Sequence, residues 1–205
     1  MGKGQVEAIT LVLITGIVMS LAGAAYFWGK PLIEKRASIT DIAAAESFMI
    51  QLDKEIVDVA RNRGEKSISI PALSGASLLA DDTNNSVIFG FLVNQPMLAF
   101  GDDTAPVPIE SVHIDLNGTY GESPRVITLE ASPFEGQYRM TLRSAYRTLF
   151  TNVYPYRAYR IDLSAGGKTG NNKVSVSYGG TETEAIVVDG RGIEVVKTII
   201  NVRIS

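Results

Sequence analysis

Few residues in this 205-residue chain are of the types that carry out catalysis or bind transition metals. There is one histidine, His113, and no cysteine, which excludes thiolate catalysis, disulfides and the common Cys/His zinc sites. His113 alternates with Val112 and Ile114, which is typical of a solvent-facing or hydrogen-bonded strand residue. No base–nucleophile set and no Gly-rich phosphate loop stands out. We therefore expect no enzymatic activity, no cofactor and no metal site of these kinds.

Two pairs of adjacent carboxylates lie in stretches typical of turns, Asp81-Asp82 and Asp102-Asp103. Carboxylate oxygens are hard ligands that suit Ca²⁺, and two converging loops would supply several of them. Neither pair has the spacing of an EF-hand loop. Solvated turn residues are the favoured interpretation, and a calcium site is the alternative.

Other polar residues suggest surface contacts or modification. Asn84 and Asn117 each begin an Asn-X-Ser/Thr acceptor sequence for N-glycosylation, and both fall in predicted loops.

Tyrosine and arginine, which are enriched at protein interfaces, also gather in one short stretch. Its members are Tyr154, Tyr156, Arg157, Tyr159 and Arg160. A strand with one core face and one polar face explains this Tyr/Arg stretch better than a contact patch.

The longest continuous pattern in the chain is apolar and precedes all of these residues. Residues 8–28 carry no charge, and as a helix they would be about 32 Å long, close to the ~30 Å hydrocarbon core of a bilayer. The run ends in Tyr26-Phe27-Trp28, which suit a membrane–water interface and stand where a secretory signal would have its small-residue cleavage site. We predict a membrane-spanning helix that is retained in the mature protein.

Two patterns predict how this helix packs. Gly16, Ser20 and Gly23 place small residues at i, i+4 and i+7, which permits close helix packing in a bilayer or a filament core. After a bend expected at Pro31, apolar residues continue at spacings of three and four, with charged residues such as Asp53 assigned off the stripe. The stripe consists of Ile39, Ile42, Ala45, Met49, Leu52, Ile56 and Val59. Packing on the following domain is its favoured explanation, and filament packing is the other.

The helix is expected to end before Gly64, which accepts a left-handed cap, and short alternating stretches follow. Strands are predicted at residues 67–70, 86–93, 111–116, 125–130, 138–143, 156–163, 174–178, 184–188 and 193–204, with a short helical turn near 144–150. Turn-forming clusters, Gly179-Gly180 among them, separate these strands. The spacing predicts an antiparallel sandwich or barrel, with residues 193–204 as its closing strand. The expected fold class is α+β: a long N-terminal hydrophobic helix followed by a β-rich domain over residues 66–205.

The residues just before the span carry a resemblance. Lys3-Gly4-Gln5, followed by Glu7 at the start of the apolar run, resembles the class III signal sequence of archaeal type IV pilins and archaellins. The resemblance implies that a prepilin peptidase-like enzyme cuts between Gly4 and Gln5. Residues 1–4 would then be a leader, and residues 5–62 a helix that stays on the subunit. Glu7 would be the third mature residue, whereas the common family pattern places this Glu fifth.

The resemblance also implies a function. The chain would be a structural subunit of a surface filament related to adhesion or motility, held in the membrane first and then packed through its helix against copies of itself. Glu7 would pair with the new α-amino group of Gln5 on a neighbouring subunit. The alternative is an uncut single-span anchor that presents a β-sandwich outside the cell, as a stator-like, receptor or adhesin module. The net charge of −3 indicates no nucleic-acid partner.

Overall fold

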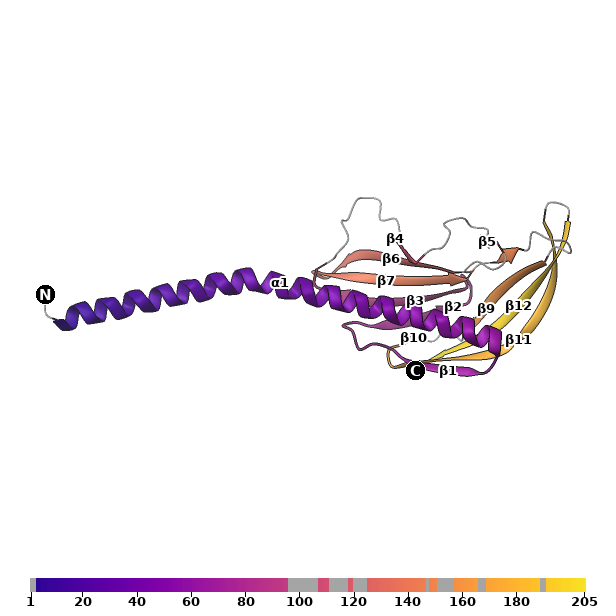
Figure 1. The fold of residues 1–205 in the computed structure, drawn as a ribbon, viewed down its shortest axis with the longest axis horizontal. Helices are drawn as coiled ribbons and strands as arrows, with labels where there is room; N and C mark the ends of the chain where they lie inside the picture. Colours follow the sequence, from indigo (N-terminus) through magenta and orange to yellow (C-terminus); the bar gives the residue numbers. More distant parts are fainter. Residues whose placement is uncertain are drawn as a thin grey trace.

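A computed structural model describes residues 3–95, 107–110, 118–119, 125–146, 148–150, 157–165, 169–188 and 191–205. Figure 1 shows one long helix that runs out from a β domain, with its N-terminus far from the strands. The helix is α1 (Lys3–Asn62), and the strands form two sheets. The predicted α+β class is therefore confirmed.

Within the described residues, each sheet has six strands. Sheet A has the order β1 (Glu65–Ser69), β11 (Lys173–Val188), β12 (Arg191–Ile204), β9 (Arg157–Ala165), β8 (Leu149–Phe150) and β5 (Gly118–Thr119). Sheet B has the order β10 (Thr169–Gly170), β2 (Ser77–Asp81), β3 (Ser86–Val93), β7 (Gln137–Tyr146), β6 (Arg125–Phe134) and β4 (Val107–Glu110). The hydrophobic core lies between the sheets and the second half of α1, which contacts strands of both.

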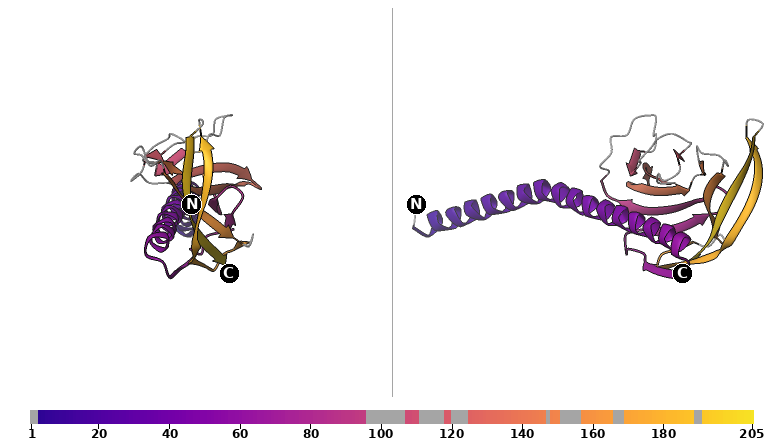
Figure 2. Two further views of the ribbon diagram at one scale, coloured as in Figure 1. Left: turned by 90° about the vertical axis from the view of Figure 1, so that its right-hand side faces the viewer. Right: turned by 45° about the vertical axis from the view of Figure 1, so that its right-hand side comes forward.

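The helix runs without interruption through Pro31. Figure 2 shows it changing direction near the middle of its length, as expected where a proline removes one backbone hydrogen bond. Its first half stands clear of the β domain, and its second half lies along it. The two halves therefore have different surroundings.

The buried stripe of the second half agrees with the prediction except at three residues: Ile39 is not buried, whereas Phe48 and Asp53, which were not assigned to the stripe, are. Its apolar members are Ile42, Ala45, Phe48, Met49, Leu52, Ile56 and Val59. Ile39 is 39% exposed, because Ser38, four residues before Ile42, takes the buried position at this end of the stripe; the Ser38 hydroxyl accepts a 3.3 Å hydrogen bond from the Gln95 backbone N–H. Asp53, assigned off the stripe, is fully buried, because it lies four residues after Met49 and three before Ile56 on the same helix face.

The end of the helix combines two residues with left-handed backbone, Arg63 (φ 61°) and Gly64 (φ 114°). The Arg63 N–H donates to the Val59 carbonyl at 2.9 Å, and the Tyr178 N–H donates to the Gly64 carbonyl at 3.0 Å. The Arg63 guanidinium also lies 5.3 Å from the centre of the Tyr178 ring. These contacts fix the angle between α1 and sheet A, and the stop expected before Gly64 is confirmed.

In sheet B the predicted strand at residues 86–93 matches β3, whose side chains alternate between the core and the outer face. The neighbouring hairpin β6–β7 is longer than predicted. The helical turn expected near residues 144–150 is wrong, because Ser144 and Ala145 pair with Val87 and Ser86 of β3, and residues 149–150 form β8. Strand β2 was not predicted, since SLLAD shows little alternation.

Sheet A corrects three expectations. β11 is one continuous strand in place of two, because Gly179-Gly180 forms a β-bulge against β12 and not a turn; Gly180 has φ 141°. β12 does not close the sheet but lies inside it, between β11 and β9. It pairs with β9 in parallel, so the sandwich is not wholly antiparallel. The C-terminus is held by two 2.9 Å backbone hydrogen bonds between Ser205 and Lys173.

Candidate functional site: the bare half of the helix

The first half of α1, up to Ile33, is called the bare half here. It presents large apolar side chains on all sides. Those that are more than half exposed are Leu11, Val12, Leu13, Ile14, Ile17, Val18, Met19, Leu21, Tyr26, Phe27, Trp28, Leu32 and Ile33. The most apolar window of the helix has a mean hydropathy of 1.9, and none of it is buried in the molecule. By length and composition this half is able to cross a membrane, as predicted.

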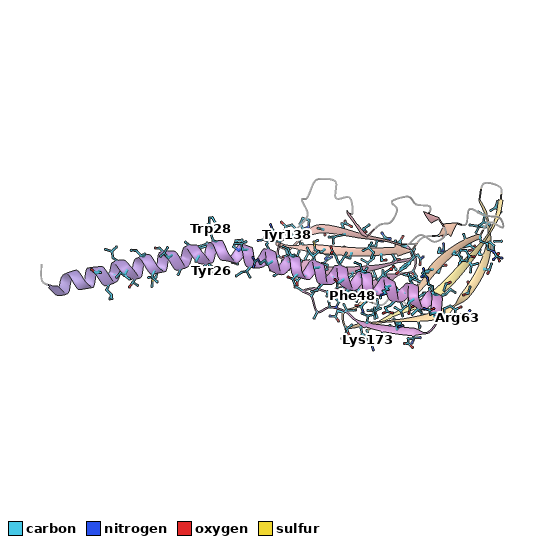
Figure 3. All side chains as sticks on the ribbon, in the orientation of Figure 1. Tyr26, Trp28, Phe48, Arg63, Tyr138 and Lys173 are labelled. Carbon is cyan, nitrogen blue, oxygen red and sulfur yellow. The ribbon has the colours of Figure 1, made fainter. Side chains whose placement is uncertain are left out.

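The polar groups of this half suit an apolar environment. The Thr15 hydroxyl donates to the Leu11 carbonyl one turn earlier, at 2.8 Å, so that it needs no solvent partner. Charge returns only after the aromatic residues, where Lys30 and Glu34 form an exposed ion pair at 3.7 Å. Figure 3 shows Tyr26 and Trp28 projecting from the helix between the bare half and the β domain. This order of apolar, aromatic and charged residues fits a membrane–water boundary.

The predicted small-residue pattern forms a shallow depression on the bare half. Gly16 and Ser20 line it together with Leu13, Ile17, Leu21 and Ala24, whereas Gly23 is not among its lining residues. A Cβ atom at Gly16 or Gly23 would meet no atom within 4 Å. Contacts within this chain therefore do not require glycine at these positions.

The residues of the predicted leader lie at the start of the same helix. The backbone of Gly4, Gln5 and Glu7 is helical, because α1 begins at Lys3. The side chain of Glu7 lies outside the part of the chain that the structure describes. Cleavage after Gly4 and a pairing role for Glu7 stay predictions.

The acidic turn at Asp81 is held by hydrogen bonds. The Asp81 carboxylate accepts from the Asn84 side-chain amide at 2.7 Å and from its backbone N–H at 3.1 Å, and these two bonds lower the pKa of Asp81. Among the described residues there is no group of three or more His, Asp or Glu placed to hold a metal ion. Asp102-Asp103 lies outside those residues, as does His113. Asp81 therefore acts as a turn residue.

The two glycosylation candidates differ in what the structure describes. Asn117 lies outside the described residues. Asn84 is exposed, but its amide already donates to Asp81, and the hydroxyl of Ser86 in the same acceptor sequence is buried beside the Arg143 guanidinium at 3.2 Å. A glycosyltransferase would therefore find this sequence more accessible before folding than after it.

Asn85 lies between Asn84 and Ser86, and the sequence predicted no role for it. Its amide donates to the carbonyls of Ile161 at 2.6 Å and Tyr146 at 3.2 Å, and its side-chain oxygen accepts from the Leu163 N–H at 2.8 Å. Tyr146 belongs to sheet B, and the other two belong to sheet A. One side chain thus connects the two sheets. Asn85 has a left-handed backbone (φ 47°), which Asn tolerates better than most residues, so its residue type in a turn-forming cluster was the signal that the sequence carried.

The Tyr/Arg stretch is described from Arg157 onward, with Tyr154 and Tyr156 outside the described residues. Its arginines take part in an ion-pair ladder across sheet A. The pairs are Arg157–Glu194, Arg160–Asp162 and Lys197–Glu184. A hydrogen bond from Arg160 to Asp162 raises the pKa of Arg160, and one from Lys197 lowers the pKa of Glu184. Arg157 and Arg160 are three residues apart on β9, so their ion pairs lie on opposite faces of the strand.

In comparisons with protein-family models, curated proteins and solved structures, no match to this chain was found. What the chain can do is therefore argued from its own residues. The feature that most needs an explanation is an apolar half-helix that its own β domain leaves uncovered.

Proposed function

We propose that this chain is a structural, non-enzymatic subunit of an archaeal type IV pilus-like surface filament, related to adhesion or motility and assembled through α1. The observation that carries the proposal is the bare half of α1, none of which is buried by the rest of the molecule. Burial of apolar surface is favourable by roughly 25 cal/mol per Å². This half must therefore be covered by something else, first by lipid and then by copies of the same helix.

Two further features support filament packing over lipid alone. The depression at Gly16 and Ser20 would let a neighbouring helix approach closely, and contacts within the chain do not require glycine at residue 16. The second half of α1 is built into the core of the β domain, so that packing of the first half would set the position of the whole domain. Such a rigid connection suits a subunit that must repeat along a filament.

Glu7 supplies the charge in this proposal. A carboxylate near the hydrocarbon costs a few kcal/mol by insertion scales unless it is paired. Cleavage after Gly4 would create an α-amino group on Gln5 of each copy. We propose that this group pairs with Glu7 of a neighbouring subunit during assembly.

The experiment is expression of the full chain with a prepilin peptidase, followed by terminal mass analysis and electron microscopy. We expect loss of residues 1–4 and visible filaments. Glu7→Ala should leave the circular dichroism of the β domain unchanged and strongly lower filament yield. Glu34→Ala is the matched control, because it removes a carboxylate of the same helix whose partner, Lys30, lies within the chain. A normal filament yield from Glu7→Ala would refute the pairing.

The second candidate is a single-span anchor that presents the β domain and does not polymerise. The exposed aromatic residues at 26–28 are consistent with it, because a stable membrane span needs such an interfacial end even where no filament forms. In this case mass analysis of the membrane fraction finds the chain beginning before Gln5, and no filaments appear under conditions in which the peptidase cuts a control substrate.

A further inference from the structure

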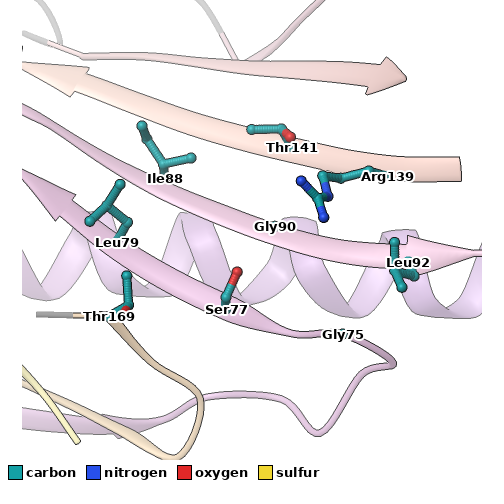
Figure 4. Close-up of a pocket in the computed structure, with 9 residues that line it drawn as sticks. All are labelled: Gly75, Ser77, Leu79, Ile88, Gly90, Leu92, Arg139, Thr141 and Thr169. Carbon is teal, nitrogen blue, oxygen red and sulfur yellow. The ribbon is translucent and has the colours of Figure 1, made fainter. Parts of the chain in front are cut away.

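The outer face of sheet B carries a groove of about 380 Å³ that no function discussed above uses. Figure 4 shows it running across β2, β3 and β7, on the face opposite α1. Its apolar part is formed by Leu79, Ile88 and Leu92, all of them half-buried. Half-buried aliphatic side chains on the outer face of a sheet give the groove a surface suited to an apolar ligand face.

The centre of the groove is Gly90, within the eight-residue strand β3. Its cross-strand neighbours are Ser77 on β2 and Thr141 on β7. A Cβ atom placed at Gly90 would have only Ser77 atoms within 4 Å, the nearest being the hydroxyl oxygen at 3.4 Å. Glycine inside a strand often marks a place where a ligand approaches the backbone. Here it opens a hollow with a hydroxyl group on each side.

One side of the groove is lined by a cationic side chain, that of Arg139. Arg139 belongs to β7 and lies opposite Leu92 of β3. The Arg139 guanidinium stacks on the Phe134 ring, 4.1 Å from the ring centroid. Within the described part of the chain, Arg139 forms no ion pair with a carboxylate. Stacking holds the guanidinium in place while its N–H groups stay available, which is the arrangement that recognises a carboxylate with two parallel hydrogen bonds.

We propose that this groove binds a carboxylated sugar, such as a hexuronate unit of an acidic glycan. A pyranose ring has an apolar C–H face for the aliphatic side chains, hydroxyl groups for Ser77 and Thr141, and a carboxylate for Arg139. A simple anion would leave the apolar floor unused, and a purely apolar ligand would leave the guanidinium without a partner. The proposal does not depend on filament formation, since an anchored monomer would carry the same groove.

The test is a calorimetric titration of the full chain in detergent micelles with three probes. Methyl glucuronide should bind with a Kd in the millimolar range, as expected for a small ligand in a shallow groove. Methyl glucoside, which has the same ring without the carboxylate, should bind about tenfold more weakly, the effect of losing one charged hydrogen-bonded pair of about 1.4 kcal/mol. Sodium acetate, a carboxylate without a ring, should not bind measurably.

Two variants and a control assign the contacts. Arg139→Gln should reduce the affinity for the glucuronide to that for the glucoside, and Gly90→Val should abolish binding of both by filling the hollow. Arg203→Gln, which removes an exposed arginine of sheet A, should change neither. Equal affinity for glucuronide and glucoside, acetate binding as tight as glucuronide, or no effect of Arg139→Gln would each overturn the proposal. No binding of the glucuronide by the unmodified chain would overturn it as well.

Discussion

The rings of Phe48 on α1 and Phe89 on β3 lie with their centroids 5.1 Å apart and their planes tilted by 57°. Both side chains are buried, and Phe89 also stacks on Phe91 at 5.7 Å. This contact joins the helix to sheet B in the middle of the core. The first half of α1 and the β domain keep one relative position only as long as the helix stays docked here.

Phe48→Ala is expected to destabilise the β domain by about 3–5 kcal/mol, the usual cost of removing a buried phenylalanine and leaving a cavity. Urea unfolding of the full chain in micelles, followed by circular dichroism of the strands, measures the change. Ile50→Ala is the control on the same turn of the helix, because Ile50 is 38% exposed, and it should change stability by less than about 1 kcal/mol. Equal effects of the two substitutions would show that the Phe48–Phe89 contact does not hold the helix in place.

Asn85 is expected to be the most sensitive polar residue among its neighbours in the turn. Asn85→Gly keeps the left-handed backbone but removes three side-chain hydrogen bonds, two of them to sheet A, and should cost roughly 2–4 kcal/mol in unfolding free energy. Asn84→Ala removes one exposed side-chain bond to Asp81 and should cost less than about 1 kcal/mol. The same urea titration measures both. A larger loss for Asn84→Ala would contradict the role assigned to Asn85.

Stability should fall in acid partly through Asp81. Its pKa is lowered in the folded state by the hydrogen bonds from Asn84, so its contribution is complete above the unfolded pKa near 3.8 and is lost as the pH falls through the folded pKa. Asp81→Asn should therefore weaken the pH dependence of unfolding between about pH 5 and about pH 2. Asp82→Asn removes the same charge from the same turn and leaves the Asn84 bonds in place. The prediction fails if both variants, or neither, change the slope.

Local patterns in the sequence were enough for the main elements of the fold. The spacing of apolar residues in α1 predicts a helix with one buried stripe, and the apolar run SVIFGFLV predicts both ends of β3. What they could not predict depends on contacts distant in sequence. The position of β12 inside sheet A and its parallel pairing with β9 are set by packing of the whole domain, and a Gly-Gly pair looks the same in a bulge as in a turn.

The candidate site, too, could be predicted from the sequence only in part. The apolar run was visible in the sequence, but only the arrangement of α1 and the β domain shows that the run is left uncovered while residues from Ser38 onward are packed. Asp53 was misplaced because its charge was given more weight than its spacing from Met49. Asn85 was overlooked because its three partners all lie more than sixty residues away in the sequence, two of them in the other sheet.

The chain's single tryptophan, Trp28, makes the membrane interpretation testable without reference to filaments. Trp28 is 81% exposed at the end of the bare half, where an amphipathic ring favours the headgroup region. In lipid vesicles its emission should shift to the blue, and lipids brominated near the headgroup should quench it more than lipids brominated at the chain ends. The double variant Trp28→Phe with Val187→Trp moves the fluorophore to a residue of β11 that is 76% exposed, and its emission should resist both quenchers. Emission from Trp28 that stays at its value in water, and is insensitive to either lipid, would contradict insertion of the bare half of α1 into a bilayer.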